Sequence, residues 1–325
     1  MGRCYLAGFL EEAKAIEEKL IGWRRDFHRH PELRFEENRT ARVIADFLSG
    51  LSIEVQTGVG KTGVVGLLKG NKEGPTALMR FDMDALPIQE ENAVDYCSEV
   101  PGVMHACGHD GHMAMGMGVA WLLARHRDDL NGAVKLVFQP AEEGAGGARA
   151  MIADGVLENP HVDISFGIHI QSQTPSGTYL IGDGPVLAAA DRFRCFIRGK
   201  GGHGAIPQST VDASIIATEM VNLLQTIVSR NVDPLKPAII SIGSLHTGTT
   251  FNVIPETAEI TGTIRTYEEE VQDLVHKRMN EVVQGTAQLF GAEAKLEIEK
   301  IVPAAFNDPI ICKKTRDLAI QLVGK

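Results

Sequence analysis

The sequence contains no uninterrupted apolar run that approaches the roughly 20 residues needed to cross a bilayer. It also has no excess of positive charge, because 42 acidic residues outnumber 32 Lys and Arg and give a formal net charge of -10. A surface that binds nucleic acid normally carries clustered Lys and Arg. We therefore expect neither a membrane nor a nucleic acid as a partner.

Cysteine is scarce and shows no pairing pattern. The five cysteines are odd in number and widely spaced, and no two of them form a C-x-x-C motif. This pattern does not predict a disulfide framework and favours a reducing cytoplasm. The sequence begins with one Arg followed by acidic residues in a helical pattern, which does not predict a signal peptide. We expect a cytoplasmic protein.

At 325 residues the chain is long enough for two hydrophobic cores. Residues 1–186 alternate helical patterns with β-rich runs such as TALMRFDM, AVKLVFQP and TYLIGD. They predict an α/β catalytic domain with a mostly parallel central sheet flanked by helices. Residues 187–299 follow the order β-α-β-β-α-β, which predicts an inserted ferredoxin-like domain. We expect residues 300–325 to return to the catalytic domain and to complete it only in part.

The stretch MHACGHDGH holds three of the eleven histidines and one of the five cysteines. Cys107 and His109 are two residues apart, so in an extended segment one ion could meet a thiolate and an imidazole. An isolated C-x-H pair is coincidence in roughly half of cases. His105, Asp110 and His112 share the stretch, and we expect them to support the site or to begin a helix.

Three predicted strands also end in groups that can bind metal. Glu142 and Glu143 follow AVKLVF, Asp82 and Asp84 follow TALMRF, and His169 closes GIH. An isolated Glu pair is a solvated turn in roughly 80% of cases. Ligands collect at the carboxyl ends of strands in α/β sheets, so coincidence at three such ends becomes the weaker explanation. The aspartates either ligate a metal or orient a ligand. One glutamate can bind metal while its neighbour holds the attacking water.

The motifs HRHPEL, DMDALP, HACGHDGH, QPAEEG and GGHGAIP together resemble the zinc-aminoacylase and hippurate hydrolase branch of the di-metal amidohydrolase and carboxypeptidase family. That branch includes plant hydrolases of auxin conjugates. The resemblance runs from about residue 20 to the end, with the motifs in the family's order. It implies two divalent metal ions in the α/β domain and a ferredoxin-like lid domain that forms a homodimer. Thiolate and imidazole ligands favour zinc, carboxylates also suit manganese, and cobalt and nickel are further candidates.

The resemblance also implies roles for individual residues, carried over motif by motif. The implied metal ligands are Cys107, His109, Glu143 and His169. The implied catalytic residues are Glu142 as general base, Asp84 as the carboxylate that orients the metal site, and His203, which polarises the substrate carbonyl, often across the dimer. Asn252 of FNVIP and Arg265 of GTIRTYE match positions that hold the substrate carboxylate, which suits the forked guanidinium of Arg.

The C-terminus departs from the family pattern. Family members continue past the lid with more catalytic domain and a final metal-binding His, whereas this sequence ends at QLVGK. The resemblance therefore implies a C-terminally truncated chain without the last ligand. The expected function is metal-dependent hydrolysis of the amide bond of N-acyl amino acids. A dipeptidase or aminopeptidase of the same superfamily remains an alternative, as does a non-catalytic metal-binding or dimerisation protein.

Overall fold

The computed structural model describes residues 2–324, without the side chains of residues 2–7 and 323. The chain divides into two compact units. The second unit is Tyr179–Ala319, and the first unit consists of the residues before it together with the short segment that begins at Ile320. Each unit has its own hydrophobic core.

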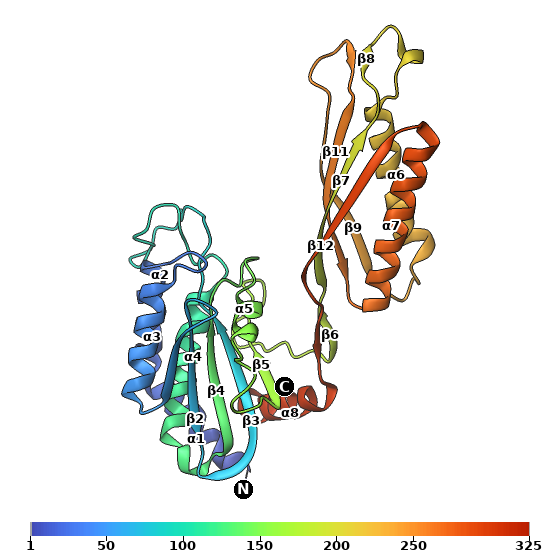
Figure 1. The fold of residues 1–325 in the computed structure, drawn as a ribbon. Coiled ribbons are helices and arrows are strands. Elements are labelled where there is room, and N and C mark those ends of the chain that lie inside the picture. Colours follow the sequence, from blue (N-terminus) through green and yellow to red (C-terminus); the bar gives the residue numbers. More distant parts are fainter. Residues whose placement is uncertain (1, 325) are drawn as a thin grey trace. The chain divides into compact units, whose positions relative to one another are not determined.

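The first unit is a five-stranded sheet with helices on both faces (Figure 1). The strands lie in the order β1-β2-β4-β3-β5. They are β1 (Glu54–Val59), β2 (Gly63–Lys69), β3 (Lys72–Asp82), β4 (Asn131–Gln139) and β5 (Ile164–Gly167). The helices are α1 (Gly2–Ala15), α2 (Glu17–Arg29), α3 (Asn38–Gly50), α4 (His109–Arg125), the 3-10 turn η1 (Arg127–Asp129) and α5 (Gly147–Ala153).

The two faces of this sheet carry separate cores. Leu136 and Phe138 on β4 pack into a cluster with apolar residues of α2, α3 and α4. Val137, between them, packs with Met151 of α5 on the other face. This alternation follows from the two-residue period of a strand. The last seven residues of β4 are all buried, which suits a strand that is covered on both faces.

The sheet is mixed, although the sequence predicted a mostly parallel one. Strand β3 pairs in parallel with β4 and β5, whereas β2 pairs antiparallel with β1 and β4. The connections explain this difference, because parallel neighbours need a crossover of a dozen or more residues and only a tight turn joins β1 to β2. The predicted strand TYLIGD is also wrong: residues 178–183 have no strand partner, and β6 (Gly184–Leu187) begins after them.

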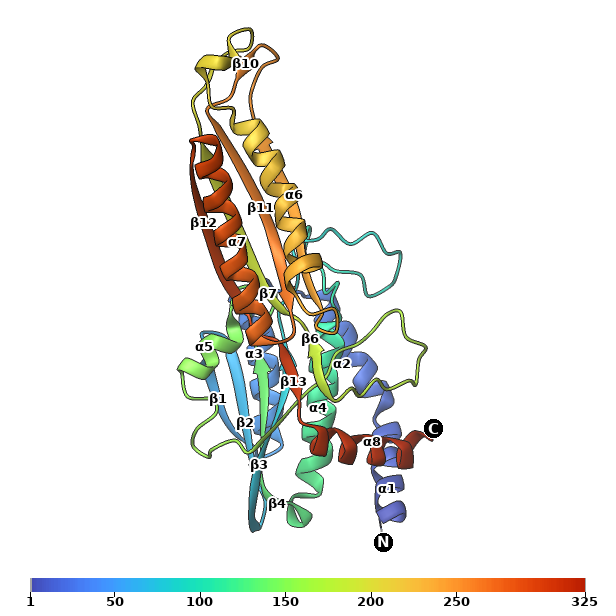
Figure 2. The same cartoon turned by 90° about the vertical axis from the view of Figure 1, so that its right-hand side faces the viewer.

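The second unit is a four-stranded antiparallel sheet with α6 and α7 side by side on one face (Figure 2). The strands lie in the order β12-β7-β11-β9. In chain order the elements are β7 (Ala189–Arg198), α6 (Ala213–Asn231), β9 (Ala238–Thr247), β11 (Thr257–Thr266), α7 (Glu269–Phe290) and β12 (Glu293–Val302). This is the β-α-β-β-α-β order expected from the sequence. Shorter elements are β8 (Gly202–His203), η2 (Pro207–Ser209), β10 (Val253–Ile254) and β13 (Ala305–Asn307), and the last helix is α8 (Pro309–Val323).

The observed division of the chain differs from the expected boundaries at residues 187 and 300. Strand β6 pairs with β13, so the segments that enter and leave the four-stranded sheet are joined to each other. Asn307 donates a further hydrogen bond to the carbonyl of Gly182. These contacts explain why residues 179–186 and 300–319 belong to the second unit.

Neither a disulfide nor a membrane-spanning helix occurs in the described part of the chain. The cysteines whose side chains are described are free, and they are Cys97, Cys107, Cys195 and Cys312. The side chain of Cys4 lies outside the described residues. Among residues 2–324, no helix combines the length and the apolar character that a bilayer crossing requires.

A buried charge network anchors the loop of residues 83–108, which runs from the end of β3 to the start of α4. His28 on α2 places Nδ1 2.7 Å from Asp110 Oδ2 and Nε2 3.1 Å from Glu90 Oε1. Carboxylates only accept hydrogen bonds, so the two contacts together favour the imidazolium. The bond to Asp110 is the main cause of a raised pKa for His28, and the bond to Glu90 adds to it.

This network predicts a pH-dependent contribution to stability. Because the folded-state pKa of His28 is raised, its contribution is fully present below the unfolded value near 6.5 and is lost as pH rises through the folded value. We expect the difference in unfolding free energy between the parent and His28→Ala to be larger at pH 6 than at pH 9. Urea unfolding of metal-free protein, followed by the fluorescence of Trp23 and Trp121, measures it. A difference that grows with pH would contradict the charged network.

Candidate functional site

The ends of three neighbouring strands and the start of one helix bring the candidate residues of the first unit together. Asp82 is the last residue of β3, the pair Glu142 and Glu143 follows β4, and His169 follows β5. Cys107 and His109 lie at the start of α4, where Gly108 has a φ of 89°. That left-handed conformation favours glycine, and it turns the chain between the two residues.

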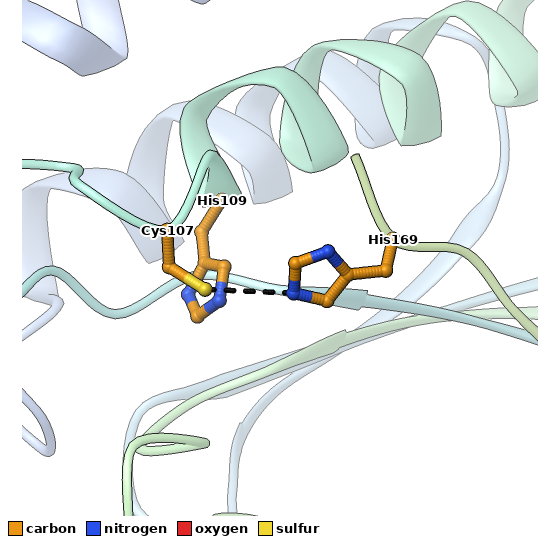
Figure 3. Close-up of side chains that lie close together, drawn as sticks. All are labelled: Cys107, His109 and His169. Carbon is orange, nitrogen blue, oxygen red and sulfur yellow. Dashed lines mark hydrogen bonds between the residues drawn. The ribbon is translucent and has the colours of Figure 1, made fainter. Parts of the chain in front are cut away.

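Cys107, His109 and His169 present their donor atoms to one small volume (Figure 3). The three atoms lie within 4.8 Å of one another, and Cys107 Sγ is 3.5 Å from His169 Nε2. Two further groups of the same size are His109 with Glu142 and Glu143, and His109 with Asp82 and His112, so His109 belongs to all three. Sulfur, imidazole nitrogen and carboxylate oxygen are the donors found in zinc sites.

Backbone hydrogen bonds orient both imidazole rings. His109 Nδ1 donates to the carbonyl of Asp84 over 2.8 Å, and His169 Nδ1 donates to the carbonyl of Ile170 over 2.7 Å. A carbonyl can only accept, so in the neutral ring Nδ1 carries the proton and Nε2 presents its lone pair. In His169 this nitrogen faces Cys107 Sγ. His109 Nε2 is buried and has no hydrogen-bond partner among the described residues, although Asp82 Oδ2 lies 3.5 Å away. Nitrogens placed in this way can bind a metal ion, so these residues fit one.

The thiol of Cys107 has an environment that opposes ionisation in the metal-free chain. Burial and then the negative charge of Glu143 raise its pKa to about 12. The group is therefore a neutral thiol at physiological pH when no cation is present. A bound divalent cation reverses this electrostatic preference, since a coordinating thiol is deprotonated.

Asp84 orients the loop that follows β4. Its Oδ1 accepts from the backbone N–H of Glu142 over 2.9 Å, and its Oδ2 accepts from that of Glu143 over 3.0 Å. The carboxylate is buried, and His109 Nδ1 lies 3.4 Å from Oδ1. Both oxygens therefore have backbone partners, an arrangement that suits a residue which orients the metal site.

Asp82 and His112 are buried beside His109, and the ring of His112 also contacts that of His169. His112 Nδ1 lies 2.5 Å from Asp82 Oδ1, while His112 Nε2 accepts from the backbone N–H of Ile170 over 2.9 Å. Both nitrogens of His112 thus have partners. Burial raises the pKa of Asp82, but the bond from His112 and the charge of Arg80 outweigh it and lower the pKa to about 2.

Arg80 is a charged neighbour of these residues that the sequence did not predict. Its Nη1 lies 2.7 Å from Asp82 Oδ2 and its Nη2 lies 3.9 Å from Glu142 Oε1. Burial raises the pKa of Glu142, whereas the charge of Arg80 lowers it, and the net shift is upward. Arg80 and Asp82 are two residues apart on β3, so the strand period places them on one face and could have indicated this contact.

The remaining candidates belong to the second unit and fall at two ends of its sheet. His203 on β8 pairs with Val253 on β10, and the N–H of Gly204 donates to the carbonyl of Asn252. His203 and Asn252 are therefore neighbours. Arg265 pairs with Ala190 at the start of β7, while the chain reaches β8 only after the end of that strand. The unit does not bring Arg265 together with Asn252.

The hydrogen bonds of these residues differ. His203 is exposed, and its Nδ1 accepts from the N–H of Ala205 over 3.1 Å, so Nε2 carries the proton in the neutral ring. An exposed N–H at this position can donate to a ligand. Arg265 donates to Thr263 Oγ1 and to the carbonyl of Ile264, so part of its guanidinium is used within β11.

Known proteins with similar sequences and folds are named as peptidases and amidohydrolases. The chain is 43% identical over 302 residues to thermostable carboxypeptidase 2 of Saccharolobus solfataricus. The aligned region covers 92% of this chain and 76% of that protein. It is 43% identical over 285 residues to the N-acyl-L-amino acid amidohydrolase of Geobacillus stearothermophilus, with 87% and 76% covered. The Bacillus subtilis YXEP protein, described by its crystal structure as a dinuclear metal-binding peptidase of the M20 family, superimposes with a TM-score of 0.84 at 38% identity, with 95% and 81% covered.

The sequence profile of one peptidase family matches most of the chain. The match spans residues 78–325, so it includes the Cys/His motif, the glutamate pair, His169 and the whole second unit. Together with the convergent donor atoms, it identifies this chain as a metal-binding hydrolytic enzyme that belongs to peptidase family M20/M25/M40.

Proposed function

We propose that this chain hydrolyses the amide bond of N-acyl amino acids. The observation that carries the proposal is the convergence of a thiol, two imidazoles and the glutamate pair at one edge of the first unit's sheet. The Geobacillus stearothermophilus relative supports the substrate class through its name. A carboxypeptidase and an N-acyl amino acid amidohydrolase cut the same kind of bond, an amide whose nitrogen belongs to an amino acid with a free carboxylate.

Cys107, His109, Glu143 and His169 are the proposed metal ligands. The Nε2 atoms of both histidines, which face the donor cluster, and the buried His109 Nε2 without a hydrogen-bond partner among the described residues support their assignment. Mixed sulfur, nitrogen and oxygen donors favour zinc, and manganese remains the second candidate. When bound, two such ions supply Lewis acidity to the amide carbonyl and to the attacking water.

Glu142 is the proposed general base. It is the pair's more exposed member and stands beside Arg80 at the edge of the donor cluster. Its carboxylate takes a proton from water as the water oxygen bonds to the amide carbon, and it then returns that proton to the leaving nitrogen as the C–N bond breaks. A raised pKa for Glu142 suits both steps.

The second unit supplies the proposed lid and dimer contacts. The proton on His203 Nε2 can stabilise the oxyanion that develops on the carbonyl. Asn252 and Arg265 are proposed to hold the substrate carboxylate. Because they are separated within the unit, the proposal requires that they come from different subunits of a homodimer or contact different substrate groups. Phe251, next to Asn252, is 99% exposed, which supports a partner at this loop. The free cysteines support a cytoplasmic location.

The first prediction concerns the general base. Glu142→Gln removes the basic oxygen but keeps the shape and the thiol and imidazole ligands, so we expect unchanged bound metal and a turnover lower by about 10²- to 10⁴-fold. Hydrolysis of a panel of N-acyl amino acids and dipeptides, with zinc or manganese added, measures it.

Arg34→Lys is the control variant for these assays. Arg34 contacts the same loop, because its guanidinium donates to the carbonyl of Glu143 from an exposed position, but it is not proposed to take part in the reaction. We expect Arg34→Lys to retain most of the turnover.

Turnover near the parental rate in Glu142→Gln would show that another group is the base. Preference for dipeptides with a free amino group would favour a dipeptidase, and metal binding without any turnover by the parent would favour a non-catalytic protein.

The second prediction concerns the dimer. If His203 acts in the partner's site, a heterodimer of His203→Ala and Glu142→Gln contains one site with both groups. We expect this heterodimer to recover about half of the parental turnover, although each homodimer is nearly inactive. Differently tagged subunits, purified as verified heterodimers, measure it. An inactive heterodimer would assign His203 to its own subunit's site or to no catalytic role.

A further inference from the structure

We propose that Glu37, far from the metal motifs in sequence, is a positioning residue that fixes the loop carrying Glu142 and Glu143. The proposal rests on the proposed function of that loop. Glu37 precedes α3 and its side chain is fully buried. It makes no hydrogen bond to the first turn of that helix, although it occupies the N-cap position. Its carboxylate is therefore committed to other partners.

Those partners are one backbone amide of the catalytic loop and one hydroxyl. Glu37 Oε1 accepts from the N–H of Ala141 over 2.9 Å, and Oε2 accepts from Thr62 Oγ1. Thr62 belongs to the turn between β1 and β2, so the carboxylate joins that turn to the loop after β4. Ala141 itself is completely buried, which means that water cannot replace Glu37 as the acceptor without a rearrangement.

The backbone of Ala141 explains why an acceptor is needed there. Its φ is 50°, in the left-handed region that a residue with a Cβ adopts only when its surroundings impose it. This turn directs the next two residues away from β4 and towards the donor atoms of Cys107 and His109. The hydrogen bond to Glu37 stabilises the turn at the position where the strain is located.

Three consecutive amides of this loop are bound by two buried carboxylates. Glu37 binds the N–H of Ala141, and Asp84 binds those of Glu142 and Glu143. The bond from Glu37 fixes the first of these three amides, and the carbonyl of Ala141 also accepts from the N–H of Gly147. The side chain of Glu142 therefore projects from a backbone that is held on both sides of it.

This arrangement predicts which substitutions matter. A glutamine at position 37 can accept from Ala141 through its oxygen and donate to Thr62 through its nitrogen, so Glu37→Gln keeps both contacts. Burial raises the pKa of Glu37, and a neutral amide is therefore well tolerated there. Glu37→Ala removes both contacts and frees the buried N–H of Ala141.

The test uses the full chain without metal and then with metal. Amide hydrogen exchange of metal-free protein reports the loop directly, and we expect Ala141 to exchange at least about 10-fold faster in Glu37→Ala than in the parent. Exchange at Val137 within β4 should be unchanged, and Glu37→Gln should match the parent at both amides. With metal and substrate, kcat of Glu37→Ala should fall about 10- to 100-fold with KM within about 2-fold, because a misplaced base affects the chemical step.

Two further variants separate positioning from loss of stability. Ile44→Val lies on the same helix, is fully buried and does not touch the loop, so it should lose stability without a change in kcat or in Ala141 exchange. Thr62→Val leaves Glu37 Oε2 without its donor, so it should raise the exchange rate of the Ala141 amide by a smaller factor than Glu37→Ala does. This variant replaces Glu37→Ala in the test if Glu37→Ala does not fold. The proposal is overturned if the amide of Ala141 exchanges at the parental rate in Glu37→Ala. If Glu37→Ala does not fold, the same result in Thr62→Val overturns it. An equal kcat loss in Ile44→Val does so too. Accelerated exchange in a chain that hydrolyses no substrate would support the positioning role while contradicting the proposed function.

Discussion

The candidate site depends on the hydrogen bonds of one buried residue, Asp84. Its backbone carbonyl accepts from His109 Nδ1, and its side-chain oxygens accept from the amides of Glu142 and Glu143. These contacts connect the end of β3, the start of α4 and the loop after β4. The tautomer of a proposed metal-binding imidazole and the direction of two glutamates are thereby set by the same residue, before any ion is bound.

The metal-free site carries polar groups that the fold does not satisfy. His109 Nε2 is buried without a hydrogen-bond partner among the described residues, with Asp82 Oδ2 3.5 Å away. The Cys107 thiol lies beside Glu143, which opposes its ionisation. A divalent cation would satisfy the nitrogen and stabilise the thiolate together. Membership of peptidase family M20/M25/M40 and the fold shared with a dinuclear metal-binding peptidase agree with this interpretation. Metal binding should therefore also stabilise the folded chain.

The sequence predicted the groups that gather at the sheet edge because strand ends and the C-x-H spacing are local patterns. Asp82, the Glu142–Glu143 pair and His169 each follow a strand, and three such ends meet in a sheet of this class. Glu37 and Arg80 were not predicted as contacts of this site. The bond between Glu37 and Ala141 joins residues far apart in the chain, so no local period indicates it.

The mixed sheet was not predicted, because an alternation of helices and strands does not reveal strand direction when one connection is a tight turn. Strand register places His203 beside Asn252 and places Arg265 at the other end of its sheet. The motifs do not encode this register, so the sequence did not predict these positions.

The most direct test of the account is the ultraviolet absorption of the cobalt(II)-loaded chain. Charge transfer from a thiolate to cobalt gives an absorption band that imidazole and carboxylate ligands do not produce. We expect the parent to show this band at neutral pH, although the pKa of the metal-free thiol is about 12, and Cys107→Ser to lose it. Cobalt bound by the parent without the band, or a band that persists in Cys107→Ser, would show that Cys107 is not a ligand and would contradict the proposed metal site.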